Sequence, residues 1–306
     1  MTFMLNCPIA MLKSKPPYLQ LIRNQNKMRK ALSILLVFNL ALASTWLIQE
    51  HKVHSQTAEI EQTVDLKQHF DSLGVNGSII VYDLKGDRTY QHNPNRNNTE
   101  FRPASTYKIP NSLIALETGE IEDDVTILTW DGIERGLNDS PIEVWNQDLN
   151  LRLAFKYSAV WFYQVLARKI GHQRMQDFVS KIDYGNQNIG KAEDIDRFWL
   201  SGELRITPQQ QIDFLRRFYQ NDLPFSQRTI DIVKDIAIVE QTPDYVMRGK
   251  TGWEVSVTPN IGWYVGYLEQ NDNVYFFVTN LDLVSENDSA ARLEVTRLCL
   301  QELGLL

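Results

Sequence analysis

Predicted β-strands lie at both ends of the chain, with helical patterns between them. Toward the N-terminal side, Gly77–Asp83 and Arg88–Tyr90 have the composition of two strands joined by a short turn. Three segments near the C-terminus are rich in Val, Tyr, Phe and Trp and are separated by turn residues: Tyr245–Lys250, Ile261–Leu268 and Val274–Leu283. Strands at both ends fit most economically into one antiparallel sheet, which restricts the helical middle to a separate lobe.

Helical segments occur at both ends of the predicted domain and throughout its middle. Thr57–Leu73 and Ser289–Leu303 carry apolar residues at helical spacing. Pro208–Tyr219 is the clearest helix of the middle, because Thr207 can cap it and proline fits its first position. The Asn-rich residues 93–99 predict a polar loop. We expect an α/β (α+β) fold, in which an antiparallel sheet is flanked by the terminal helices and an all-helical lobe is inserted.

The N-terminal segment has the three parts of a secretory signal. The basic triplet that starts at Met28 precedes the apolar run Ala31–Leu42, and a small-x-small triplet ends at Ala43. We expect the true start at Met28, a signal peptide over 28–43, a leader and linker over 1–54, and a catalytic domain over 55–306. The protein would then be secreted or periplasmic. The alternative is an uncleaved membrane anchor, since Thr45–Ile48 could lengthen the apolar run.

Charge and cysteine content exclude some classes of partner and crosslink. Residues 1–43 carry six basic and no acidic side chains, so the remainder has 25 basic and 38 acidic residues, a net charge of −13. Such an acidic protein is a poor partner for nucleic acid. Of the two cysteines, Cys7 lies in the leader, so Cys299 has no intrachain disulfide partner. Its helical spacing predicts a small buried residue. Oligomeric state leaves no signal in the sequence.

A serine and a lysine three residues apart stand at the start of a predicted helix. Residues 102–110 read Arg-Pro-Ala-Ser-Thr-Tyr-Lys-Ile-Pro, in which Ser105 and Lys108 share one face if the segment is helical. Pro103 fits a helix start and places Ser105 in the first turn. A serine hydroxyl is a poor nucleophile until a base takes its proton, and a buried neutral lysine is such a base. By itself, the pattern is more often a surface helix start.

Three further short motifs follow in order along the chain. Ser158-Ala159-Val160 offers a second hydroxyl that could relay a proton. Residues 184–186, Tyr-Gly-Asn, are typical of a turn. Residues 250–253, Lys-Thr-Gly-Trp, offer a cation, a hydroxyl and a backbone that a ligand can approach closely, at the expected end of a strand. Each motif alone is better explained as ordinary turn or strand structure.

Taken together, the ordered set resembles the class D serine β-lactamases, which belong to the penicillin-recognising serine enzymes. Ser-x-x-Lys and Lys-Thr-Gly also occur in class A enzymes and penicillin-binding proteins. Ser-x-Val, in contrast, resembles the motif of class D enzymes and not that of class A. Residues 198–200, Phe-Trp-Leu, resemble the class D segment beyond Tyr-Gly-Asn. The resemblance covers about 77–306 and implies a β-lactamase/transpeptidase-like fold, β-lactam antibiotics as substrates, and no metal.

The resemblance implies catalytic roles for four residues. Ser105 would attack the lactam carbonyl and become acylated, and Lys108, carrying CO2 as a carbamate, would act as general base. Ser158 would pass the proton to the departing lactam nitrogen, and Lys250 would assist through its local field. Carbon dioxide or bicarbonate would be the one small molecule required besides the substrate.

Further residues would bind the substrate or support the carbamate. Thr251 and Arg292 would hold the substrate carboxylate, since a guanidinium can donate two parallel hydrogen bonds to it. Gly252 would allow close approach, and the backbone N–H groups of Trp253 and Ser105 would form an oxyanion hole. The two carbamate-supporting residues would be Val160, which lines the pocket, and Trp199, whose indole N–H is a donor. For Arg292, a solvated helix arginine remains the alternative.

One residue departs from the commonest class D pattern and keeps an alternative function open. Tyr107 stands where the family most often has phenylalanine. A tyrosine at this position resembles the sensor domains of β-lactam receptors, which acylate and stay acylated. None of the five histidines lies in the His-Glu-x-x-His motif of such receptors. A penicillin-binding sensor or acyl-trap domain is therefore the alternative to a β-lactamase, followed by a cell-wall D,D-peptidase. No stable membrane partner is expected unless the leader stays uncleaved.

Overall fold

The fold is that of a computed structural model, which describes residues 64–137, 140–284 and 288–306. The expected signal peptide and the expected boundary after residue 54 lie outside these ranges, so both stay predictions. Within the described ranges, no helix is both long and apolar enough to cross a membrane.

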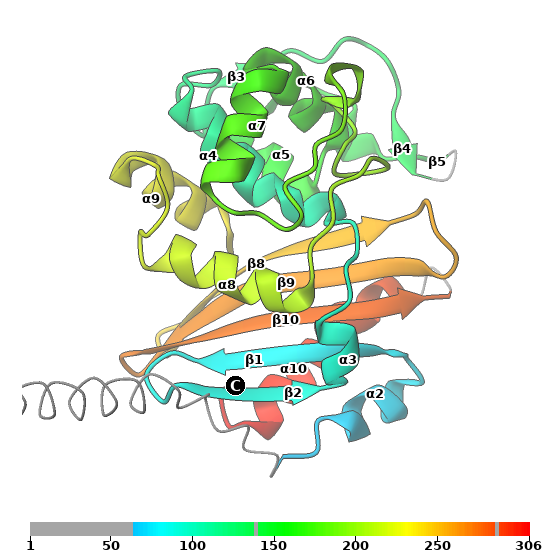
Figure 1. Ribbon diagram of the computed structural model, residues 1–306, viewed down its shortest axis with the longest axis vertical. Coiled ribbons are helices and arrows are strands. Elements are labelled where there is room, and N and C mark those ends of the chain that lie inside the picture. Colours follow the sequence, from blue (N-terminus) through cyan, green and yellow to red (C-terminus); the bar gives the residue numbers. More distant parts are fainter. Residues whose placement is uncertain (1–63, 138–139, 285–287) are drawn as a thin grey trace, which may run out of the picture. The chain divides into compact units, whose positions relative to one another are not determined.

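One six-stranded antiparallel sheet joins the two ends of the described chain (Figure 1). Its spatial order is β2-β1-β10-β9-β8-β7. The first strand therefore pairs with the last, with Gly77 opposite Leu281. The strand bounds are β1 (Gly77–Asp83), β2 (Arg88–His92), β7 (Ile238–Gln241), β8 (Tyr245–Glu254), β9 (Asn260–Gln270) and β10 (Asn273–Leu283).

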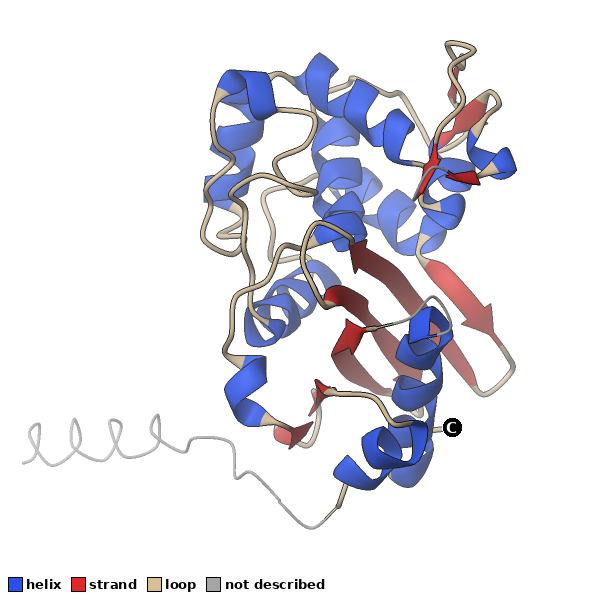
Figure 2. Cartoon of the chain, turned by 90° about the vertical axis from the view of Figure 1, so that its right-hand side faces the viewer, coloured by secondary structure: helices blue, strands red, loops and turns tan. Residues whose placement is uncertain are grey.

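Alternating side chains of β1 belong to two separate cores. Ile79 and Val81 pack against α2 (Lys67–Leu73) and α10 (Asp288–Glu302), whereas Ile80 and Tyr82 pack toward the inserted lobe. A strand presents successive side chains to opposite faces, so a nearly all-buried strand must be covered on both sides. Helices accordingly lie on both sides of the strands (Figure 2).

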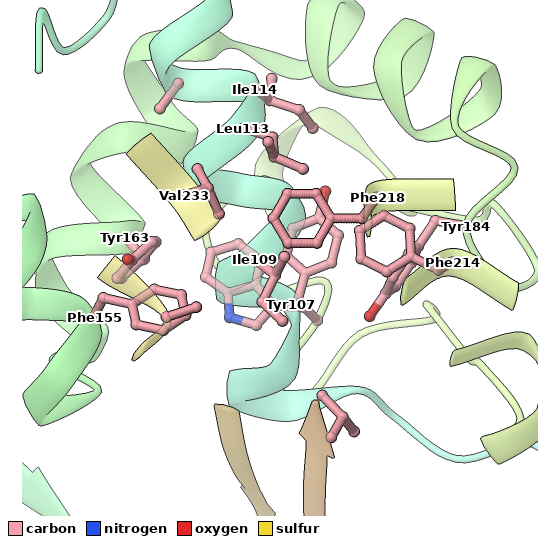
Figure 3. Close-up of a cluster of buried hydrophobic side chains, with 14 of the residues drawn as sticks. Tyr107, Ile109, Leu113, Ile114, Phe155, Tyr163, Tyr184, Phe214, Phe218 and Val233 are labelled. Atoms are coloured by element: carbon pink, nitrogen blue, oxygen red, sulfur yellow. The ribbon is translucent and has the colours of Figure 1, made fainter. Parts of the chain in front are cut away.

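The inserted lobe is built around α4 (Lys108–Glu117), which is buried along almost its whole length. Aromatic and aliphatic side chains from several helices surround it (Figure 3). The helices that complete the lobe and connect it to the sheet are α5 (Leu151–Tyr157), α6 (Val160–Ile170), α7 (His172–Lys181), α8 (Pro208–Tyr219) and α9 (Gln227–Ile236). The lobe also contains two short strand pairs, β3 (Ile127–Leu128) with β6 (Leu149–Asn150), and β4 (Gly136–Leu137) with β5 (Ser140–Pro141). The prediction that the lobe contains only helices was therefore wrong in this detail.

Local details differ from the sequence predictions where polar side chains redirect the backbone. Of the helix expected over Thr57–Leu73, residues 57–63 lie outside the described ranges. The described part begins at Lys67, because the Asp65 carboxylate accepts from the Lys67 N–H and forms a turn there. The expected polar loop at 93–99 contains a short helix, α3 (Pro94–Asn97), which the Asn93 side chain caps. The α9 helix was not predicted, although Ser226 caps it and its apolar residues have helical spacing.

Candidate active site

Ser105 lies in a 3₁₀ turn, Ala104–Tyr107, that leads directly into α4. Ala104 has a φ of 48°, a left-handed conformation that is costly for a residue with a side chain. The turn is held by the Thr106 hydroxyl, which donates to the carbonyl of Pro103, and by the Ala104 N–H, which donates to the carbonyl of Trp199. The serine therefore sits at the start of the helical segment, as predicted.

Lys108 is one turn beyond the serine and reaches back to it. Its Nζ donates to Ser105 Oγ at 2.8 Å. The lysine is 1% exposed, and its ammonium position lies 5.2 Å from the ring centre of Tyr163. Burial and the nearby positive charge of Lys250 hold the pKa of Lys108 well below its usual value. A neutral amine can accept a proton, so this lysine has the chemistry of a general base.

Lys250 projects from β8 into the same region from the sheet side. It lies within β8 and not at a strand end as predicted, because β8 continues to Glu254. Its Nζ donates to the carbonyl of Thr251 at 3.0 Å and lies 5.7 Å from the ring centre of Phe155. Burial, followed by the charge of Arg292, lowers the pKa of Lys250 to about 7.

The edge of β8 beside the lobe is open where these residues lie. β7 pairs with β8 only through Val246, Met247 and Arg248. Among the described residues, no strand pairs with 250–254 on that side. Within 250–254, the carbonyls of Thr251 and Gly252 already accept from Lys250 and Arg292. The backbone groups of this edge that have no such partner are available to a ligand in the cleft.

Burial of Lys250 is expected to cost stability, in a way that depends on pH. Its pKa of about 7 in the folded state lies below its ordinary value of 10.5. The unfolded state therefore binds more protons between these values, and stability rises with pH in that window. Lys250→Met should raise the melting temperature at pH 6–7 and reduce the rise between pH 7 and 10, with a free-energy effect on the order of a few kcal/mol. Thermal melts across pH measure both effects.

The outcome for Lys250→Met is separable from the contribution of Lys108. The pKa of Lys108 is also depressed, so part of the pH-dependent rise should remain in the variant. A variant that melts lower than the parent protein at pH 6 would contradict the prediction.

A cleft of about 550 Å³ brings together most of the predicted site residues. Three buried groups lie outside its lining: Lys108 and Trp199 are in the core, and Lys250 lines a neighbouring cavity of about 600 Å³ that shares Thr251 with the cleft. The predicted residues that do line the cleft are Ser105, Ser158, Val160, Thr251, Gly252, Trp253 and Arg292.

Ser158 is held in the cleft by the junction between α5 and α6. It follows the last residue of α5 with a φ of 59°, a left-handed conformation, and Ala159 then leads into α6. Its N–H donates to the carbonyl of Phe155. A non-glycine residue in this conformation is unusual and is often retained for function. The predicted second hydroxyl thus faces the same cleft as Ser105.

Arg292 reaches the cleft from α10 and is not a solvated helix arginine. It is 9% exposed, and its guanidinium donates to the carbonyls of Gly252 and Ser289. Gly262 makes room for it, since a Cβ there would lie 2.8 Å from Arg292 Cδ. Burial lowers the pKa of Arg292 to about 10. No carboxylate pairs with this guanidinium among the described residues, which leaves it able to bind an anion.

Trp199 joins the nucleophile turn through its carbonyl, which accepts from the Ala104 N–H, and its indole is an unused donor. It is fully buried, and its Nε1 has no hydrogen-bond partner in the described structure. Tyr107 stacks on it with ring centres 5.6 Å apart, and the Tyr107 hydroxyl donates to Met175 Sδ in the lobe core. The hydroxyl of Tyr107, the residue that departs from the commonest class D pattern, therefore bonds to a sulfur in the core and does not line the cleft.

The Tyr-Gly-Asn turn supports the segment that carries Trp199. The Asn186 side chain accepts from the Arg205 N–H and donates to the Glu203 carbonyl. Gly185 has a φ of 58°, and a Cβ there would lie 2.0 Å from the Arg205 carbonyl oxygen. The motif is thus structural, in agreement with its interpretation as a turn.

Several cleft residues had no role in the sequence predictions. Trp145 and Tyr157 form one wall, where the Trp145 indole donates to the Tyr157 carbonyl. Leu200 lines the cleft beyond Trp199. Their only sequence signal was the aromatic and apolar content of the lobe, which indicates a core equally well.

Comparison with known proteins places this cleft in a family. A family model described as the penicillin-binding protein transpeptidase domain matches residues 75–301. The β-lactamase OXA-48 of Klebsiella pneumoniae is 39% identical over 244 residues, which cover 80% of this chain and 89% of that protein. Among solved structures, the class D β-lactamase YbXI from Nostoc matches with a TM-score of 0.77 and 60% identity, over 80% of this chain and 100% of the other. The chain belongs to the class D β-lactamases.

Other members of the family match over similar lengths. OXA-10 of Pseudomonas aeruginosa is 35% identical and covers 81% of this chain and 91% of its own. A class D β-lactamase structure from Bacillus subtilis has a TM-score of 0.73 at 34% identity, over 80% of this chain and 97% of the other. Family membership confirms the predicted resemblance, fold and enzyme class. The roles of individual residues in this class D β-lactamase remain predictions.

Proposed function

We propose that this class D β-lactamase hydrolyses the amide bond of penicillins and related β-lactams through an acyl-enzyme on Ser105. The contact between Lys108 Nζ and Ser105 Oγ, at 2.8 Å in a buried setting, carries the proposal. Lys108 takes the hydroxyl proton as Ser105 Oγ bonds to the lactam carbonyl carbon. The carbon–nitrogen bond then breaks, and Ser158 passes a proton to the nitrogen. Water finally cleaves the ester, which returns the serine hydroxyl and releases the opened product.

The cleft offers complementary groups for the rest of a β-lactam. Arg292 and the Thr251 hydroxyl bind its carboxylate, and Lys250 adds positive potential beside the reacting atoms. The N–H groups of Ser105 and Trp253 stabilise the developing oxyanion. Gly252 lies against the nucleophile turn, since a Cβ there would be 3.1 Å from the Pro103 carbonyl oxygen. A side chain at this position would press on the turn, which would have to shift by a few tenths of an ångström.

The surroundings of Lys108 fit the CO2 modification that the family resemblance implies. A depressed pKa supplies the neutral amine that reacts with CO2. Trp199 Nε1 is a buried donor without a partner in the described structure, and Val160 supplies apolar cover at the cleft. When bound, CO2 would give the lysine a carboxylate-like base. Lys108 would hold this group, and Trp199 would donate to its oxygen.

Replacing Trp199 should make activity depend more strongly on bicarbonate. Trp199→Phe keeps an aromatic ring but removes the donor, so activity at ambient CO2 should fall by about ten- to a hundredfold and recover in part with added bicarbonate. Carbon-13 NMR with labelled bicarbonate measures the lysine modification directly. Tyr107→Phe is the matched control, because its hydroxyl bonds to Met175 and not to the site. Equal bicarbonate dependence in all three proteins would contradict the role of Trp199.

One assay separates this function from its rivals. Purified protein is incubated with a chromogenic cephalosporin and bicarbonate, and we expect sustained turnover. A single burst equal to the enzyme concentration would instead indicate a sensor or acyl-trap domain. Cleavage of D-Ala-D-Ala peptides would indicate a cell-wall peptidase.

We also propose a secreted or periplasmic location, supported by the sequence pattern from Met28 to Ala43 alone. Cell fractionation and N-terminal sequencing of the mature protein test this location. Retention of the protein in the membrane fraction would favour an uncleaved anchor.

A further inference from the structure

A buried ion pair lies beneath the nucleophile turn and takes no part in the proposed chemistry. Arg102 Nη1 donates to Glu254 Oε1 at 2.6 Å, and the side chains are 17% and 3% exposed. The Ser256 hydroxyl lies beside the pair, accepting from Arg102 Nη1 and donating to Glu254 Oε1, each at 3.1 Å. A buried charge is stable only when it is paired and hydrogen-bonded, so this arrangement is constrained.

The same arginine also holds a third segment. Its Nε donates to the carbonyl of Gly202 at 2.8 Å, and its own carbonyl accepts from the Trp263 indole at 2.9 Å. Gly202 lies in a tight turn, where a Cβ would be 2.6 Å from Phe198 Cα. Arg102 therefore joins the nucleophile turn to the end of β8 and to the 197–206 segment.

Each of the joined segments contributes part of the cleft wall. Leu200 comes from the 197–206 segment, and Trp253 and Val255 flank Glu254. In the proposed reaction the substrate carboxylate lies at Thr251 and Arg292, and the lactam carbonyl points to the Trp253 N–H. The acyl side chain is attached next to that carbonyl, so it extends away from Arg292 and toward Val255 and Leu200.

We propose that Arg102 and Glu254 are positioning residues that set the width of the cleft where the acyl side chain lies. Their ion pair, with the bond to Gly202, fixes the Leu200 wall relative to the Trp253–Val255 wall. The inference rests on the proposed function. A large acyl group contacts Leu200 and Val255 on the two walls and depends on their spacing, whereas a β-lactam without an acyl group contacts only the Trp253 N–H of these residues.

The test compares two β-lactams in variants of the pair. Arg102→Met alone leaves a buried carboxylate without a counter-charge and is expected to destabilise the fold. Combining R102M with E254M removes both charges and gives the variant to assay. Steady-state kcat and KM are measured for oxacillin, which has a two-ring acyl group, and for 6-aminopenicillanic acid, which has none. Melting temperatures are recorded for every protein.

In the double variant, we expect kcat/KM for oxacillin to fall about tenfold or more, mainly through KM. The value for 6-aminopenicillanic acid should stay within about threefold of the parent. The charge-swapped variant, R102E with E254R, should recover part of the oxacillin value. The matched control is R96M with D282M, since Arg96 and Asp282 form a partly buried pair whose residues do not line the cleft.

Distinct outcomes would overturn this inference. A folded double variant that keeps the parent ratio of the two kcat/KM values, or that loses activity on both substrates equally, contradicts the positioning role. A comparable change in the ratio for the control pair does so as well. If the parent protein turns over neither β-lactam, the proposed function has failed before any variant is compared.

Discussion

Ser105→Ala should abolish covalent labelling by penicillin and lower kcat/KM by about four to six orders of magnitude. The serine oxygen forms the bond to the substrate carbonyl in the proposed reaction, and Lys108 cannot reach the carbonyl in its place. Intact-protein mass spectrometry after incubation with penicillin measures the adduct. A stoichiometric penicillin adduct on Ser105→Ala would refute the assignment of the nucleophile.

The loss in this variant should not come from unfolding. The only side-chain bond of Ser105 in the described structure is the one from Lys108 Nζ. The turn itself is held by Thr106 and by the Ala104 N–H. We expect a melting temperature close to that of the parent. Ser158→Ala serves as the comparison, because it should still be labelled, only more slowly.

Replacing Lys108 should trap the enzyme after its first chemical step. Lys108→Met approximately keeps the buried volume but removes the base, so acylation should slow while hydrolysis of the acyl-enzyme should slow further. The expected loss in kcat is about 10²- to 10⁴-fold, the usual contribution of a general base. Stopped-flow absorbance should show one product per enzyme followed by almost no turnover.

The persistence of the adduct distinguishes this effect from a loss of binding. Mass spectrometry should find acylated Lys108→Met long after the parent enzyme has returned to its free form. Sustained turnover by this variant at the parent rate would show that another group acts as the base.

The chemistry-bearing residues could be predicted because their spacing is local. Ser105 and Lys108 meet across a single turn, and that contact depends on little else. The sheet could be predicted because its strands are strongly apolar and well separated. The position of Lys250 in the middle of a strand could not be predicted. The strand continues to Glu254 because that residue pairs with Ile261 and forms a buried ion pair with Arg102, and neither contact is visible in the local sequence.

Contacts between residues far apart in the sequence could not be predicted. Nothing local marks Arg102 as the partner of Glu254, since the two are 152 positions apart. From the sequence alone, Trp145 is likewise indistinguishable from a core residue, and only the packed structure shows that it lines the cleft. Burial of Arg292 also requires a neighbour without a side chain, Gly262, on another element. These features depend on tertiary packing, which periodicity does not report.

The incomplete pairing of β8 has a consequence for what the enzyme recognises. From Lys250 onward the outer edge of the strand presents main-chain groups to the cleft, without a strand beside them in the described structure. A ligand that carries its own amide can align there as a surrogate strand, in the manner of β-augmentation. Such main-chain hydrogen bonds would bind the peptide-like backbone that many acylamino compounds share. Selectivity among these compounds would then depend on the side chains that line the cleft walls.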